Sequence, residues 1–256
     1  GNIRWEVRAM EQELFEGLKK SRNWALEVLC QDHLKRCWFL CCRLAGDTAG
    51  GAPLLIASLK AALGRVKEMT EPPKEDLQEL LSMEILTQYQ KGLEPSEEFQ
   101  ALPPPQVARE YRPLVDEVEQ LPPASRPYYW MYAYGGLKSQ QISQAVGMEE
   151  EKLQGMLQHC EERLAQRRVQ WDKPQRAAYI RLTTQLRDGG GNGFSQVQLS
   201  DTLLTTLWKE VGLPVKPAKK KEKKPWTRKR LTTLGVAVGV IALLIAAGVL
   251  ALILMM

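Results

Sequence analysis

The final 26 residues of the chain, 231–256, contain no charged side chain. They read LTTLGVAVGVIALLIAAGVLALILMM, and a helix of about 20 apolar residues is enough to cross the hydrocarbon core of a bilayer. A buried core helix of this length and uniformity would be unusual, so the run predicts a single transmembrane helix. This expectation constrains the whole chain, because the preceding residues must then form whatever the helix anchors.

A strongly basic block comes directly before this run. Residues 216–230 hold nine Lys or Arg and one acid, whereas the whole chain carries a net charge of +5, so the other residues are slightly acidic. Basic residues next to a membrane span favour the cytoplasmic side, which predicts a single-pass protein of the cytoplasmic membrane with its body in the cytoplasm. Either the span is a tail anchor or an external segment follows it. The membrane-proximal side chains expected to attract anionic lipid are Lys219, Lys220, Lys221, Lys223, Lys224, Arg228, Lys229 and Arg230.

The rest of the chain shows helical periodicity and no strand-like alternation of any length. Apolar spacing predicts helices at 3–20, 24–44, 54–67, 74–89, 106–119, 123–134, 138–146, 149–168 and 199–211. The expected class is all-α, with two small helical domains and a C-terminal transmembrane helix. The predicted segments are an N-terminal helix (1–22), a helical domain (23–90), a Pro-containing linker (91–105), a second helical domain (106–170), a flexible juxtamembrane segment (171–230) and the membrane helix (231–256).

Residues 121–168 have the pattern of a helix-turn-helix. Ser139 is placed to cap a helix that carries Ile142, and Gly147 suits the turn because glycine adopts a left-handed conformation easily. The inward face of the second helix is predicted to consist of Leu153, Met156, Leu157, Cys160 and Leu164. A generic helical hairpin is the alternative reading of this stretch.

The order Leu121-Pro122, an aromatic-rich helix, Gln141-Ile142-Ser143 and Val146-Gly147-Met148 resembles region four of bacterial RNA polymerase sigma factors of the extracytoplasmic-function type. Residues 24–66 are similar, more weakly, to region two of that family. The resemblance implies that the second domain reads promoter DNA and that the first binds core RNA polymerase. The side chains left for contact with DNA are Ser139, Gln140, Lys152, Gln154, Gln158, His159 and Arg163, with Arg167 and Arg168 at the far end of the helix.

The chain departs from the family pattern at the positions that matter most for these contacts. Where the family has an acidic and amide-rich run for the polymerase, residues 53–57 read Pro-Leu-Leu-Ile-Ala. The predicted recognition helix, 149–164, holds five acids against two bases, and acids repel the phosphates that normally position a DNA-binding protein.

Three functions therefore remain open. The first is a membrane-tethered sigma-like transcription regulator. The second is a sigma-like scaffold that has lost DNA binding and docks a protein at the membrane, such as another sigma factor or its inhibitor. The third is a one-component DNA-binding regulator with an external sensor.

No motif predicts catalysis or a cofactor. The sequence contains no Gly-rich phosphate loop, nucleophile elbow or HExxH motif. His33, Cys37 and Cys41 recur every four residues on one helix face, but a straight helix does not wrap ligands round an ion, and buried cysteine is common in cores. The expectation is a protein that is not an enzyme, with no cofactor and no metal.

Overall fold

The computed structural model describes residues 2–169, 171–187 and 193–215. Every regular element in these ranges is helical, which confirms the all-α class for the part of the chain described. The predicted membrane helix and the basic block lie outside these residues. Among the helices that are described, none combines the length and the apolar character needed to cross a bilayer.

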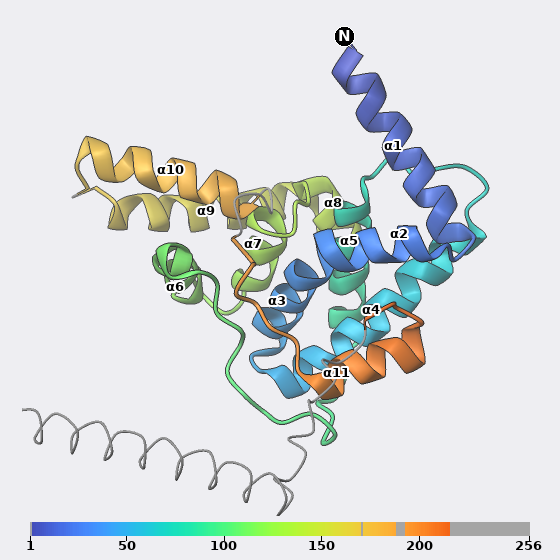
Figure 1. Ribbon diagram of the computed structural model, residues 1–256. Coiled ribbons are helices and arrows are strands. Elements are labelled where there is room, and N and C mark those ends of the chain that lie inside the picture. Colours follow the sequence, from blue (N-terminus) through green and yellow to red (C-terminus); the bar gives the residue numbers. More distant parts are fainter. Residues whose placement is uncertain (1, 170, 188–192, 216–256) are drawn as a thin grey trace, which may run out of the picture. The chain divides into compact units, whose positions relative to one another are not determined.

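The helical elements follow the order shown in Figure 1. They are α1 (Asn2–Lys19), α2 (Asn23–Val28), the π-helical turn η1 (Leu29–His33), α3 (Leu34–Ala45), α4 (Thr48–Glu68), α5 (Leu77–Gln90), the 3-10 turn η2 (Arg109–Tyr111), α6 (Arg112–Glu119), α7 (Arg126–Ala133), α8 (Ser139–Val146), α9 (Glu150–Arg167), α10 (Lys173–Arg187), α11 (Asp201–Thr206) and the π-helical turn η3 (Leu207–Val211).

Helix α4 begins six residues earlier than the sequence predicts, and Pro53 lies inside it rather than near its start. Asp47 caps the helix, because its Oδ1 accepts a hydrogen bond of 2.7 Å from the amide of Gly50. A proline cannot donate to the carbonyl four residues before it. Here that carbonyl, of Ala49, instead accepts a bond of 3.1 Å from the amide of Ser96. The loop after α5 thus supplies the donor that lets a proline sit within this helix.

Helices α3 and α4 pack closely against each other. A Cβ on Gly51 would lie 2.6 Å from the Sγ of Cys42 and 3.0 Å from its Cα. Only a glycine allows the two backbones to approach this closely. Gly50 and Gly51 therefore lie within α4, and Gly51 faces α3.

Helix α10 was not predicted from the sequence, and it lies within the segment expected to be flexible. Asp172 Oδ1 accepts a bond of 2.8 Å from the amide of Gln175, and the Gln175 side chain accepts one of 2.9 Å from the amide of Asp172. This reciprocal pair is a capping box, and Pro174 falls in the first turn, where its missing amide hydrogen costs nothing. The start signal of this helix is thus visible in the sequence as Asp-Lys-Pro-Gln.

Residues 194–215, at the end of the described chain, return to pack against the N-terminal helices. Trp38 on α3 donates from Nε1 to the carbonyl of Gln198 over 3.0 Å, and the ring of Phe39 lies 5.3 Å from that of Phe194. The apolar side chains of this segment that are buried are Phe194, Val197, Leu203, Leu207 and Leu213. We call residues 194–215 the C-terminal strap.

The two predicted helical domains share one hydrophobic core, and the described residues belong to a single compact unit. Helix α5 packs on α8, and α3 packs on α7. Two buried hydrogen bonds cross the junction: Ser82 Oγ donates to the carbonyl of Gly135 over 2.6 Å, and Arg36 Nε donates to that of Tyr134 over 2.6 Å. The segment from α7 to α9 is thereby fixed on the helices that precede it.

Candidate nucleic-acid interface

Helices α8 and α9 are joined by the tight turn that the sequence predicts. Gly147 has φ of +66° and ψ of 30°, the left-handed conformation. The Oγ of Ser143 donates to the carbonyl of Met148 over 2.6 Å, and the amide of Met148 donates to the carbonyl of Ser143 over 3.2 Å. This pair of bonds fixes the path of the chain through the turn, and so the direction in which α9 leaves it.

The hydrophobic core under this turn contains most of the residues predicted for it. Ile142, Leu153 and Cys160 are fully buried, and Leu157 and Leu164 are nearly so, whereas Met156 is only half-buried. In the preceding helix α7 the large aromatic side chain of Trp130 is fully buried. One side of α9 is therefore used for packing and the other is left at the surface.

Ser139 does not cap α8 as predicted, because it is the first residue of the helix and the N-cap is Lys138. The amide of Lys138 donates to Gln141 Oε1 over 2.8 Å. Gln141 thus stabilises the start of α8. Ser139 is half-buried.

Six of the seven side chains from Ser139 to Arg163 that are predicted to contact DNA are exposed. On α8 this is Gln140. On α9 they are Lys152, Gln154, Gln158, His159 and Arg163. The structure thus brings the predicted residues to one helix-turn-helix and leaves six of the seven open to solvent.

Several of these side chains bond to acids of the same surface. Gln154 donates to Glu150 Oε1 over 3.0 Å, and Ser139 Oγ lies 3.4 Å from that same oxygen. Further along α9, Gln158 donates to Glu162 Oε1 over 3.0 Å. The amides that were expected to reach bases are therefore paired with carboxylates in this structure.

The predicted contact Arg168, at the end of α9, is held in the protein rather than presented to solvent. Its Nη2 lies 2.6 Å from Glu117 Oε2, and its guanidinium stands 3.7 Å from the centre of the Tyr179 ring. Both side chains of the ion pair are 15% exposed. Arg168 thus joins α6, the end of α9 and α10, and its guanidinium is engaged by protein groups in this structure. A contact between Arg168 and DNA stays a prediction.

The acidic residue Glu161 also has a structural partner. The hydroxyl of Tyr129 donates to Glu161 Oε1 over 3.1 Å. Burial raises the pKa of Tyr129, and the neighbouring Glu161 carboxylate adds to the rise. The phenol therefore keeps its proton and its role as a donor between α7 and α9.

Residues 53–57, which replace the acidic run of the sigma-factor pattern, lie mostly inside the protein. Leu54, Leu55 and Ile56 are buried, and the last turn of the C-terminal strap packs on the same helix. At the surface, Lys60 Nζ lies 2.6 Å from Glu210 Oε2 of the strap. Apolar side chains at these positions are explained by packing.

The cysteines have the surroundings of core residues. Burial raises the pKa of Cys37 to about 12 and also raises that of Cys160, so both are neutral thiols. His33 pairs through Nδ1 with Gln78 Oε1 at 3.0 Å, and burial lowers its pKa. Among the residues that the structure describes, no three His, Cys, Asp or Glu side chains are grouped so as to hold a metal ion.

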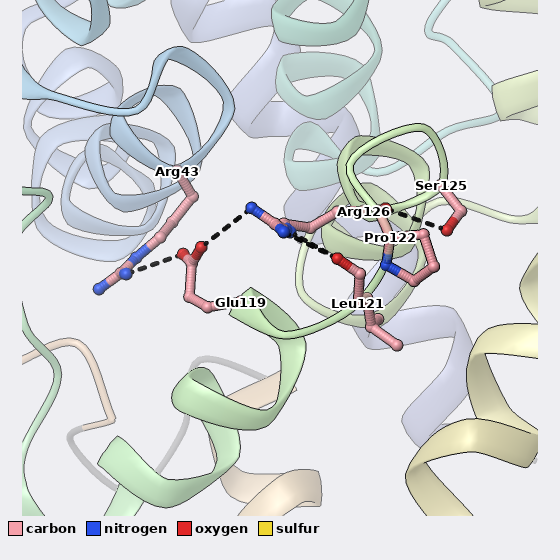
Figure 2. A network of polar contacts seen from close by, with 6 residues as sticks. All are labelled: Arg43, Glu119, Leu121, Pro122, Ser125 and Arg126. Carbon is pink, nitrogen blue, oxygen red and sulfur yellow. Dashed lines mark hydrogen bonds and ion pairs between the residues drawn. The ribbon is translucent and has the colours of Figure 1, made fainter.

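A cluster of charged side chains that the sequence did not reveal lies between α3, α6 and α7, as Figure 2 shows. Arg43 Nη1 lies 2.9 Å from Glu119 Oε1, and Arg126 Nη1 lies 3.6 Å from Glu119 Oε2. Arg126 also donates from Nη2 to the carbonyl of Leu121 over 2.8 Å. These partners are separated by up to 76 positions in the chain, and no local pattern links them.

Comparison of the chain with protein-family models, with curated proteins and with solved structures finds no match.

Proposed function

We propose that the chain is a membrane-tethered transcription regulator that resembles a sigma factor and uses α8–α9 to bind promoter DNA. The observation that carries the proposal is the α8–α9 unit itself. Its turn is fixed by Gly147 and its inner face is buried. The outer face of α9 presents Lys152, His159 and Arg163 to solvent. A second helix held in this way is the element that enters the major groove in helix-turn-helix proteins.

The membrane part of the proposal rests on sequence alone. The uncharged run 231–256 would anchor the protein, and the basic residues of 216–230 would lie at the cytoplasmic surface of the bilayer. The anchor would then restrict the regulator to DNA and polymerase near the membrane until the body is released.

The charge of α9 sets how such binding would work. Lys152 and Arg163 are exposed bases, but acids outnumber bases along the helix. Non-specific affinity, which depends on neutralised phosphates, should therefore be weak. Selectivity would come from the amide and imidazole side chains at base edges, and core RNA polymerase would supply much of the affinity.

The test is a pair of titrations with residues 1–215, at about 0.15 M salt, where weak exposed charge pairs are screened. Core RNA polymerase is titrated first, and duplexes enriched by selection on the polymerase complex are titrated next. Arg163→Ala should weaken DNA binding about tenfold and lower the salt dependence by about one phosphate. The matched control is Glu162→Gln, which removes a neighbouring negative charge and should tighten binding. Absence of saturable polymerase binding, or equal effects of both variants, would contradict the proposal.

The second candidate is a protein-docking module at the membrane, the sigma-like scaffold having lost DNA binding. The pairing of Gln154 and Gln158 with Glu150 and Glu162 favours it, because these amides are then occupied and the surface is acidic. A partner with a basic surface would fit such a helix. Under this candidate Glu162→Gln weakens capture of the partner, the opposite of its effect on DNA.

A further inference from the structure

A cavity of about 320 Å³ beside the cluster in Figure 2 has no part in the proposed function. Its wall includes residues of α3, α5, α6 and α7 and of the loops between α5 and α7. The lining side chains that matter for its chemistry are Arg43, Tyr89, Pro104, Glu119, Arg126 and Trp130. The volume is within the range of pockets that hold small molecules.

The charges at this cavity do not cancel. Two guanidinium groups, of Arg43 and Arg126, share one carboxylate, that of Glu119. Arg43 also donates to the carbonyl of Pro105 over 3.0 Å. With one acid for two bases, the site carries one positive charge in excess. A monoanion would neutralise it, whereas a dianion would not.

Two buried donors at the cavity lack an acceptor among the residues that the structure describes. They are the Nε of Arg43 and the Nε1 of Trp130. The Arg43 side chain is 5% exposed and Trp130 is fully buried. Native proteins rarely leave such groups unpaired, because each one costs about 1–3 kcal/mol. Both residues belong to the wall of the cavity, so the two unsatisfied donors lie in the layer of protein around it.

The remaining wall is mostly apolar. It contains the rings of Tyr89, Pro104, Pro123 and Pro127 and the side chain of Leu44. Flat rings and proline faces suit a planar apolar body better than a sugar or a hydrated ion. A guanidinium matches the planar geometry of a carboxylate, which it can bind with two parallel bonds.

From these observations we propose that the cavity binds a small organic monocarboxylate with a flat apolar body. The carboxylate takes donors from Arg126 and Arg43, and the body lies against the aromatic and proline wall. Glu119 competes with the ligand for the same two guanidinium groups, so it limits the affinity. The proposal does not depend on DNA or polymerase binding.

The test is isothermal titration of the full chain with phenylacetate, compared with its neutral analogue phenylacetamide and with inorganic phosphate. Phenylacetate should bind saturably with one site per chain. Phenylacetamide should bind at least tenfold more weakly, because it lacks the charge. Phosphate should compete at least tenfold more weakly than phenylacetate binds, because it has no apolar body to bury against the wall. The proposal is overturned if phenylacetate gives no saturable signal, if phenylacetamide binds equally well, or if phosphate binds equally well.

Two variants of the full chain sharpen this test. Glu119→Gln removes the competing carboxylate and should tighten phenylacetate binding about tenfold, whereas Arg126→Gln should weaken it about tenfold. A merely structural ion-pair cluster would not bind more tightly after losing its acid. Because the two variants shift affinity in opposite directions, failure of one to fold leaves the other as a test. Weaker binding by a folded Glu119→Gln variant would refute the proposed competition.

Discussion

Helices α4 and α9 are the two elements that the sigma-factor resemblance marks for contact with other molecules, and the structure uses them differently. Helix α4 is surrounded: α3, α5 and the C-terminal strap all pack on it, and Leu54, Leu55 and Ile56 are buried. Helix α9 is one-sided, with a single buried stripe and a row of exposed polar and charged side chains.

Because of this difference, a departure from the sigma-factor pattern has different consequences in α4 and in α9. In α4 the residues at the positions where the resemblance would place acids are apolar and buried, so substitutions there would affect stability. In α9 the acids that depart from the resemblance are at the surface, so substitutions there would affect which partner is accepted and leave the fold intact. The comparison predicts that substitutions in α4 act on stability and those on the outer face of α9 act on binding.

The largest expected effect is at Leu55, which is fully buried in α4. Leu55→Ala should lower the free energy of unfolding by about 2–5 kcal/mol, since it removes apolar contacts and leaves a cavity. Lys152→Ala on the outer face of α9 should change it by less than about 0.5 kcal/mol. Urea denaturation of residues 1–215 measures both. Similar losses in the free energy of unfolding for the two variants would contradict the proposed difference between α4 and α9.

The second prediction concerns Arg168, which holds the end of α9 against α6 and α10. Arg168→Met removes the bond to Glu117 and the contact with the Tyr179 ring, and should cost about 1.5–3 kcal/mol. The matched variant is Lys60→Met, whose partner Glu210 forms an exposed pair; it should cost less than about 1 kcal/mol. A double-mutant cycle with Glu117→Gln isolates the Arg168 pair. A coupling energy near zero would mean that the end of α9 is held by apolar packing alone.

The third prediction compares glycines of the two helices. Gly51→Ala in α4 should destabilise the protein by about 1–3 kcal/mol, because the new methyl group would overlap Cys42. Gly155→Ala in α9 meets open space and should stabilise it by about 0.5–1 kcal/mol through helix propensity. Gly64→Ala, also in α4 and also unobstructed, is the control for helix identity. Thermal unfolding midpoints should therefore shift in opposite directions for Gly51 and Gly155.

The last prediction concerns the buried thiol of Cys37 in α3. Its ionisation affects the free energy of unfolding only at alkaline pH. Burial raises the pKa of Cys37 from 9.0 to about 12. Between these values the unfolded chain loses the proton while the folded chain keeps it, so stability is full below about pH 9 and falls as pH rises toward 12. The slope is at most about 1.4 kcal/mol per pH unit for one thiol.

Urea denaturation at pH 8, 9, 10 and 11 measures this loss. Cys37→Ala should be less stable at pH 8 because it leaves a cavity, and its stability should fall less steeply above pH 9. Parallel pH profiles for the two proteins would show that Cys37 does not carry the effect.

Local sequence patterns are enough to predict the helical class of the described residues, most of the helices, the left-handed turn at Gly147 and the buried stripe of α9. These features depend on interactions over a few residues: apolar periodicity, caps and the conformational freedom of glycine. The start of α10 was equally readable, since its capping box is local, and was missed. The exposed positions of α9 follow from the same periodicity.

Which surfaces of these helices are buried depends on tertiary contacts that local patterns do not predict. The tertiary structure places the strap against α3 and α4, turns the Gly-Gly sequence before Pro53 into a helix contact, and supplies Ser96 as the donor for the carbonyl that Pro53 leaves free. It also pairs Arg168 with Glu117 and the ring of Tyr179, which leaves the Arg168 side chain little exposed. Each of these contacts joins residues far apart in the chain. Short-range sequence patterns do not identify such partners, because many other polar side chains of suitable length could make the same bonds.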